Sequence, residues 1–202
     1  MNTVNFFGNS VTKLIIGDNP MNGHSYIEDV TPGSEMMSFY TAERIKEAIF
    51  RAEELGFNTM LPLADPYMIR LLQEYRRDGG KMQFIFDPAN YVQCDRDPLD
   101  VYPLLKDKIA YFHIKDARMD NKRVVPAGTG SGRIPQILKD YAQTHENTML
   151  TLEPHLKAFA GLKDEVSIQY DEEAAYKDNN EAFDAGVAAL KKILDEEGLS
   201  YE

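Results

Sequence analysis

Short apolar segments alternate along this chain with longer segments whose apolar residues recur every three or four positions. The short segments predict strands and the longer ones predict helices between them. Alternating strands and helices favour a parallel sheet with helices outside it, because parallel strands need a crossover connection. The predicted strands occupy residues 13–17, 57–65, 81–87, 108–116 and 148–155.

The helix-period segments carry start and stop signals. Thr41 suits an N-cap and Gly56 suits the end of the same helix, while Pro66 suits the first turn of the next helix. Further helices are predicted near residues 98–106, 134–143 and 180–197. The chain therefore reads as a repeated β/α pattern.

Composition restricts the partners and the compartment. The chain has 202 residues, enough for one core, so we expect a single domain over 1–202. A net charge of −11 disfavours nucleic acid and anionic membranes as partners. The single cysteine, Cys94, excludes an intramolecular disulfide and fits a reducing compartment. No signal peptide or membrane span is evident, so we expect a cytoplasmic protein.

Polar and ionisable residues collect at the carboxyl ends of the predicted strands. In parallel α/β proteins this edge carries the active site. Polar residues at the ends of five strands are stronger evidence for a site than any one of these residues alone. The residues concerned are Asp18, Asp65, Asp87, Asn90, His113, Lys115, Glu153 and His155.

Each of these residues alone has a structural explanation. An aspartate at a strand end is usually a helix N-cap or a turn residue, and a histidine in an apolar strand is usually a core residue. Glu153 is harder to explain, because it follows an apolar strand and we expect it to be a buried carboxylate that needs a metal, a cation or a proton. Asp87, His113 and Glu153 form an oxygen and nitrogen set that suits Mn²⁺, Mg²⁺, Co²⁺ or Zn²⁺.

A glycine-rich segment, GTGSG at residues 128–132, allows two interpretations. Its backbone N–H groups could approach a phosphate just before the helix at residue 134. It lacks the Lys-Ser/Thr ending of a P-loop and is no dinucleotide fingerprint in this context. We therefore favour a flexible loop over a phosphate site.

Four motifs carry a resemblance to a known family. They are FDPANYVQCDRDP (86–98), YFHIKDA (111–117), VVPAGTGSGRIPQIL (124–138) and LTLEPHL (150–156). With these motifs, residues 84–202 resemble the C-terminal half of the sugar phosphate isomerase/epimerase family, which has a xylose-isomerase-like TIM barrel. Residues 1–80 resemble a different, poorly characterised group of TIM-barrel proteins, so the two sequence types meet near residues 80–86.

The resemblance implies a site and a reaction. Four residues, Glu, Asp, His and Glu, bind a divalent metal in that family, and three of them correspond to Asp87, His113 and Glu153. The implied function is metal-dependent isomerisation or epimerisation of a small sugar or sugar phosphate through an enediolate. Glu153 would also act as the base, with Lys115 as a second catalytic residue. The implied substrate-binding residues are His155 and Asn90, and Asp18 and Asp65 are added by position only.

The barrel is expected to be incomplete, with five or six βα units rather than eight. The strands that would carry the first family glutamate have no counterpart, so a reaction with two bases lacks one of them. The alternative is a non-catalytic or vestigial barrel fragment that binds a sugar or a metal or acts as an oligomeric partner. An incomplete barrel exposes sheet edges, so we expect a homo-oligomer.

Overall fold

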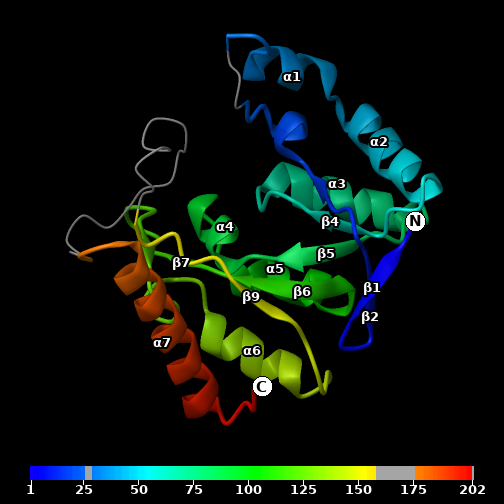
Figure 1. Ribbon diagram of the computed structural model, residues 1–202. Coiled ribbons are helices and arrows are strands. Elements are labelled where there is room, and N and C mark those ends of the chain that lie inside the picture. The colour runs from blue at the N-terminus through cyan, green and yellow to red at the C-terminus, as the bar shows by residue number, and fades with distance from the viewer. Residues whose placement is uncertain (26–28, 158–175, 202) are drawn as a thin grey trace. The chain divides into compact units, whose positions relative to one another are not determined.

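The computed structural model describes residues 1–25, 29–157 and 176–201. They divide into two compact units. The first unit contains Met1–Phe86 and Lys108–Ala110, and the second contains Asp87–Asp107 and Tyr111–Glu202. In Figure 1 the first unit runs from blue to green, and most of the second runs from green to red.

The first unit contains three strands in parallel pairing. Strand β4 (Thr59–Leu61) lies between β3 (Ile16–Gly17) and β5 (Gln83–Phe86). Met60 is opposite Ile16 on one side and Phe84 on the other. Both β3 and β4 are shorter than predicted. Strand β4 stops before Pro62, which has no N–H group for a sheet hydrogen bond.

Helices α2 (Ala42–Glu54) and α3 (Pro66–Arg77) confirm the sequence prediction. Each begins after a capping side chain, since Thr41 accepts a hydrogen bond from the Arg44 N–H and Asp65 accepts one from the Met68 N–H. Their apolar stripes are buried in the core of this unit, which contains Ile45, Ile49, Met60, Met68, Leu71, Leu72, Tyr75, Met82, Phe84 and Phe86.

The sequence prediction missed several elements of the first unit. Strands β1 (Thr3–Phe6) and β2 (Asn9–Thr12) form an antiparallel hairpin. Both turn residues, Phe7 and Gly8, have positive φ, as a type I′ hairpin turn requires. The other missed elements are the short helices η1 (Asn19–Asn22) and α1 (Gly33–Phe39).

The second unit is built around strands β6 (Ile109–Ile114) and β9 (Leu150–Leu152), although β6 begins in the first unit. They pair in parallel, with Phe112 opposite Leu150 and Ile114 opposite Leu152. In the described parts of the chain, β9 has only β6 as a partner and β3 has only β4. No closed barrel forms within these parts, as expected for an incomplete one.

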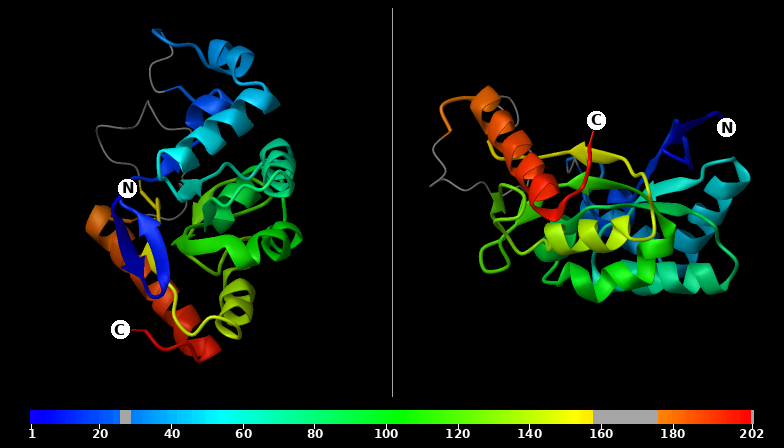
Figure 2. Two further views of the ribbon diagram at one scale, coloured as in Figure 1. Left: turned by 90° about the vertical axis from the view of Figure 1, so that its right-hand side faces the viewer. Right: turned by 90° about the horizontal axis from the view of Figure 1, so that it is seen from below.

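Four α-helices of the second unit are described. They are α4 (Pro88–Gln93), α5 (Pro98–Leu105), α6 (Ile134–Ala142) and α7 (Asn179–Glu197), with a short 3₁₀ helix, η2 (Lys106–Lys108), after α5. Helices α6 and α7 lie side by side in Figures 1 and 2. Tyr141 of α6 packs edge-on against Phe112 of β6, which anchors α6 on the apolar face of this strand.

A short hairpin follows β6 directly. Strand β7 (Asp116–Ala117) pairs antiparallel with β8 (Val124–Val125). The buried carboxylate of Asp116 accepts hydrogen bonds of 2.8–3.0 Å from the N–H groups of Ala117, Gly128, Gly130 and Gly132. The glycine-rich loop is therefore wrapped around an anion that the chain itself supplies.

These hydrogen bonds bear on the two interpretations of residues 128–132. The N–H groups of its three glycines already have an acceptor, so they are not free to hold a phosphate. A Cβ atom at Gly130 would lie 2.5 Å from Asp116 Oδ1, and one at Gly132 would lie 2.6 Å from the same oxygen. Glycine is required at both positions because the carboxylate lies against the backbone.

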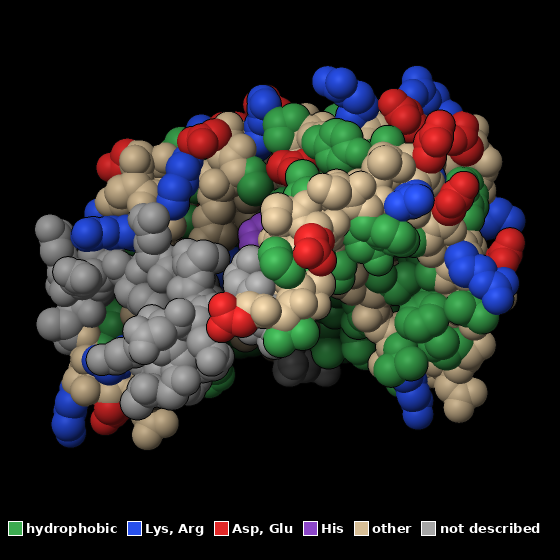
Figure 3. Space-filling model, turned by 90° about the horizontal axis from the view of Figure 1, so that it is seen from above, with side chains coloured by type: hydrophobic (Ala, Val, Ile, Leu, Met, Phe, Trp, Pro, Cys, Tyr) green, Lys and Arg blue, Asp and Glu red, His purple; other side chains and the backbone are tan. Residues whose placement is uncertain are grey.

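The charged side chains are mixed on the face drawn in Figure 3. Lysine and arginine side chains are interspersed there among aspartates and glutamates, so the negative net charge is not gathered into one patch on that face. None of the described helices is both long enough and apolar enough to cross a membrane.

Candidate functional site

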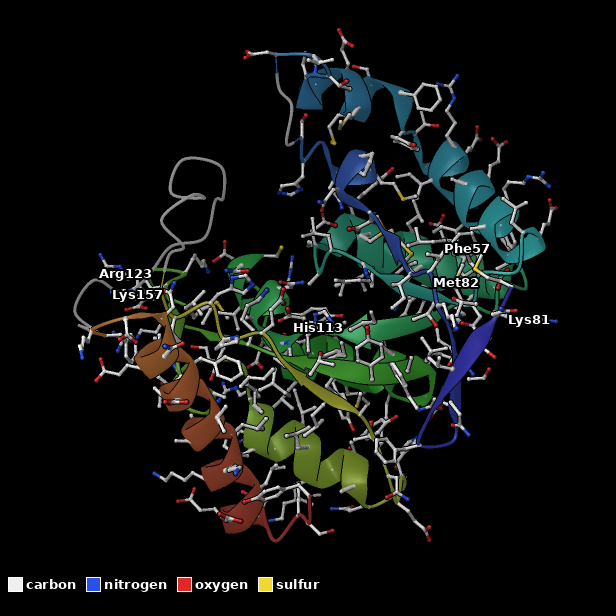
Figure 4. The ribbon with its side chains drawn as sticks, viewed as in Figure 1. Phe57, Lys81, Met82, His113, Arg123 and Lys157 are labelled. Atoms are coloured by element: carbon white, nitrogen blue, oxygen red, sulfur yellow. The ribbon has the colours of Figure 1, made fainter. Side chains whose placement is uncertain are left out.

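The register of β6 and β9 brings three of the predicted site residues together. His113 and Lys115 alternate with buried Phe112 and Ile114 along β6 and just beyond it, so both point to the face opposite the apolar one. The Glu153 N–H continues the pairing past β9 by donating to the Ile114 carbonyl (3.1 Å). Figure 4 labels His113 on β6.

Asp87 joins this group from the start of α4. Its Oδ1 accepts hydrogen bonds from the N–H groups of Ala89 (3.0 Å) and Asn90 (3.4 Å), so Asp87 is the helix N-cap. Its Oδ2 lies 2.9 Å from Lys115 Nζ. The structural and functional explanations of this aspartate are thus compatible, since each uses a different oxygen.

Glu153 is the centre of the contacts in the site. Its Oε2 lies 3.3 Å from His113 Nδ1 and 3.5 Å from Lys115 Nζ. Its Oε1 lies 3.1 Å from His155 Nε2. One carboxylate therefore contacts two imidazoles and an ammonium group.

These contacts shift the ionisation of two groups. Burial alone would raise the pKa of Glu153, but hydrogen bonds with His113 and His155 and the charge of Lys115 outweigh burial and hold that pKa well below its usual range. Burial alone would lower the pKa of Lys115, but the charges of Asp87 and Glu153 outweigh it and raise that pKa. Both pKa shifts favour a negative Glu153 beside a positive Lys115.

Asp87, His113 and Glu153 have the geometry of a metal-ligand set. Each offers one ligand atom, and these atoms lie within 4.8 Å of one another. Within the described residues, Asp87 Oδ2 and His113 Nδ1 are buried without a hydrogen bond of good geometry, and their contacts are with Lys115 Nζ (2.9 Å) and Glu153 Oε2 (3.3 Å) respectively. Buried polar atoms without hydrogen bonds are uncommon, and a cation is one group that accounts for them.

One premise of the sequence analysis is wrong. The Glu153 side chain is 40% exposed, so it is not the buried carboxylate that its apolar strand suggested. The three residues of β9 are half-buried, because this strand has a partner on one side only in the part of the chain that is described. The buried carboxylate is Asp87, whose side chain is 1% exposed.

His155 and Asn90 also belong to the second unit. His155 has a positive φ of 44°, which is unusual for a residue with a Cβ and marks a backbone held in place by its surroundings. Asn90 lies in the first turn of α4, and its N–H belongs to the Asp87 cap. The DPAN segment is therefore the start of a helix. Its Asp-Pro pair is a common helix-start signal.

Asp18 and Asp65 lie in the first unit and have hydrogen bonds there. Buried Asp18 accepts a hydrogen bond from the Leu63 N–H, and burial raises its pKa although this bond opposes the shift. Asp65 is the N-cap of α3. Both carboxylates therefore have local structural roles, and substrate binding by either stays a prediction.

The pKa shift of Glu153 predicts how stability depends on pH. A carboxylate with a lowered folded-state pKa stabilises the fold above its unfolded value, here 4.5, and loses this contribution as pH falls through the folded value. We expect Glu153→Gln to be less stable than the wild type at pH 7, with a difference that shrinks below pH 4.5. Urea denaturation over a pH series measures this, with exposed Glu146→Gln as the control. A difference that is constant with pH would contradict the assigned shift.

Comparison with known proteins gives the fold. A D-psicose 3-epimerase in the presence of D-fructose matches with a TM-score of 0.51 and 17% identity, over 86% of this chain and 58% of that one. A D-tagatose 3-epimerase-like protein matches with a TM-score of 0.50 and 14% identity, over 82% of this chain and 57% of that one. The fold is similar to part of the fold of these two proteins and is TIM-barrel-like, with no closed barrel in the described residues. The fold that the sequence motifs predicted is thus confirmed.

The same comparisons also show how much of each chain is matched. A xylose isomerase domain protein from Alicyclobacillus acidocaldarius matches with a TM-score of 0.47 and 12% identity, over 91% of this chain and 64% of that one. The chain spans little more than half the length of both epimerase structures. No protein-family model and no curated protein matches the sequence.

Proposed function

We propose that the second unit carries a metal-dependent active site that isomerises or epimerises a small sugar or sugar phosphate. The observation that carries this proposal is the convergence of Asp87, His113 and Glu153 with ligand atoms within 4.8 Å of one another. The similarity in fold to a D-psicose 3-epimerase and to a D-tagatose 3-epimerase-like protein supports the class of reaction. One of those structures was determined in the presence of D-fructose, which supports a ketose as the substrate.

The residues present fit a divalent cation. Two carboxylate oxygens and an imidazole nitrogen suit Mn²⁺, Mg²⁺, Co²⁺ or Zn²⁺, and the buried atoms Asp87 Oδ2 and His113 Nδ1 would each gain a ligand bond. When bound, the cation would polarise the substrate carbonyl and stabilise negative charge that develops on its oxygen.

The chain's own side chains supply the proton chemistry. Glu153 is the base in this proposal because its carboxylate is accessible and ionised, although the contacts that lower its pKa also weaken it as a base. Lys115 and His155 lie close enough to Glu153 to contact substrate oxygens in the same space. Asn90, in the first turn of α4, is a further substrate contact in this proposal.

A second function follows from the fact that the described residues bring only one glutamate to the site. The single metal-ligand cluster in the described residues contains one glutamate, so nothing in that cluster could return a proton from the other face of the substrate. This favours a non-catalytic fragment that binds a sugar or metal, or that acts in an oligomer with a partner completing the site. Homo-oligomerisation and a cytoplasmic location both stay predictions from the sequence.

Deuterium exchange tests the proposed reaction. The protein is incubated with Mn²⁺ and a panel of ketoses, including D-fructose, in D₂O, and NMR detects deuterium on the carbon next to the carbonyl together with any epimer. We expect exchange with the wild type and a loss of about a hundredfold or more in Glu153→Gln, the usual contribution of a general base. Asp184→Ala, an exposed change on α7, is the control and should retain the activity.

Metal binding separates the two candidate functions. Excess Mn²⁺ should raise the unfolding temperature of the wild type, because a ligand that binds only the folded state stabilises it, and Glu153→Ala should lose most of this gain. Metal stabilisation without exchange in any ketose would favour the binding-protein alternative. No stabilisation in either protein would contradict the metal site.

A further inference from the structure

We propose that Lys115 is an internal counter-ion that holds Asp87 and Glu153 together in the metal-free protein and competes with the divalent cation for them. This inference rests on the metal set of the proposed function. It adds that the chain sets its own metal affinity through a side chain that is not itself a ligand.

The geometry places the ammonium group in the position of a cation. Lys115 Nζ lies 2.9 Å from Asp87 Oδ2 and 3.5 Å from Glu153 Oε2, which brings it against two of the three proposed ligands. The Lys115 side chain is 10% exposed, so water does little to screen these contacts.

Asp87 has no second oxygen to offer a metal. Its Oδ1 is committed to the N–H groups of Ala89 and Asn90 at the start of α4, and its Oδ2 is the atom that Lys115 contacts. A cation that binds Asp87 must therefore share or take the oxygen that Lys115 holds. The competition is for one atom.

The charges show why this competition is large. Asp87 and Glu153 carry two negative charges, and Lys115 balances one of them before any metal arrives. A divalent cation would meet a net charge of −1 with Lys115 in place and −2 without it. At a few ångströms in a partly buried site, one unit charge changes an affinity by about tenfold or more.

The backbone on both sides of Lys115 is fixed. Strand β6 ends at Ile114, and β7 begins at Asp116, whose carboxylate is bound by four N–H groups. Only the side chain of Lys115 can therefore yield to a metal. Once displaced from Asp87, its ammonium group is free to contact a substrate oxygen.

Calorimetric titration with Mn²⁺ tests the inference on four proteins: the wild type, Lys115→Met, Lys115→Arg and Glu153→Gln. Methionine keeps the length of the side chain and removes the charge, whereas arginine keeps the charge. We expect Lys115→Met to lower the Kd for Mn²⁺ by about tenfold or more, and Lys115→Arg to leave it unchanged or raise it. Glu153→Gln should weaken binding, because it removes a ligand.

Thermal unfolding provides a second readout that does not depend on activity. Without metal, Lys115→Met leaves two carboxylates without a counter-ion, so its unfolding temperature should fall. Excess Mn²⁺ should then raise it by more than it raises that of the wild type. If Lys115→Met does not fold without metal, recovery of its cooperative transition in Mn²⁺ supports the inference, and Lys115→Gln supplies the Kd.

The outcomes separate this inference from the proposed function. If the wild type binds Mn²⁺, Glu153→Gln weakens binding and Lys115→Met binds no more tightly than the wild type, the metal site stands and the role of Lys115 is overturned. If neither the wild type nor Lys115→Met binds Mn²⁺, both proposals are overturned. Equal tightening by Lys115→Arg and Lys115→Met would also overturn the inference, because charge would not be the cause.

Discussion

Asp116→Ala is expected to lower the free energy of unfolding by about 3–5 kcal/mol, because it removes the acceptor of four backbone N–H groups at once. Three of these groups belong to glycines, and at two of them, Gly130 and Gly132, the backbone passes too close to the carboxylate for any side chain. The described residues offer these N–H groups no other acceptor, so the substitution would destabilise the whole loop from Gly128 to Gly132. Urea denaturation followed by circular dichroism measures the change.

Two further variants make this expectation specific. Asp116→Asn keeps one oxygen but turns an NH₂ group toward N–H donors, so it should also be destabilised, though less than the alanine variant. Asp184→Ala removes an exposed aspartate of α7 and should stay within about 0.5 kcal/mol of the wild type. An Asp116→Ala protein as stable as Asp184→Ala would show that the loop does not depend on the carboxylate.

Gly80→Ala is expected to lower the free energy of unfolding of the first unit by about 3 kcal/mol. A Cβ atom at this position would lie 2.1–2.4 Å from ring atoms of Tyr75, a fully buried residue of α3. The ring cannot withdraw, because its hydroxyl accepts hydrogen bonds from the N–H groups of Lys81 (3.1 Å) and Met82 (3.0 Å), both labelled in Figure 4. The new methyl group therefore overpacks a rigid site.

A matched control is available in the same unit. Gly17 lies in β3, and a Cβ atom added there would have no neighbouring atom within 4 Å, so Gly17→Ala should change stability by no more than about 0.5 kcal/mol. Both variants are compared by urea denaturation. Equal stability of the two alanine variants would mean that the Tyr75 ring moves aside at little cost.

Periodicity predicted the repeated β/α pattern because each helix buries one apolar stripe and each strand is a short apolar run. Helix α2 begins after Thr41 as its cap predicted, and α3 begins at Pro66. Strand ends were less predictable. Leu14 and Ile15 are apolar and were predicted to belong to a strand. They are 59% and 39% exposed, and both precede β3. Their exposure depends on partners that local sequence does not specify.

The sequence predicted which residue types form the site, but it did not predict the contacts among them. Motif order placed Asp87, His113 and Glu153 at strand ends, and their ligand atoms do converge. The sequence could not show that Asp87 divides its two oxygens between a helix cap and Lys115, or that Glu153 is exposed. These properties arise from the β6–β9 register and from the single-sided pairing of β9 in the described residues.

Asp116 was missed because its role lies outside its own segment. It follows two residues that attracted a functional interpretation, and its partners are 12 to 16 positions further along the chain. The signal that could have identified it is the spacing of glycines at 128, 130 and 132, which leaves alternate N–H groups unobstructed toward one acceptor. Asp116, an aspartate with no other assigned role, would then have been a suitable acceptor.

The loop around Asp116 also has a practical consequence for protein engineering. Its backbone is fixed from inside by a carboxylate, while Thr129 between the first two glycines is exposed. The glycines at alternate positions of the loop therefore cannot be replaced by other residues, whereas Thr129, between the first two of them, can be. Thr129 therefore offers a place to attach a reporter group or a new recognition residue without altering the hydrogen bonds to Asp116, at the cost of the one hydrogen bond that its hydroxyl donates to the Pro126 carbonyl.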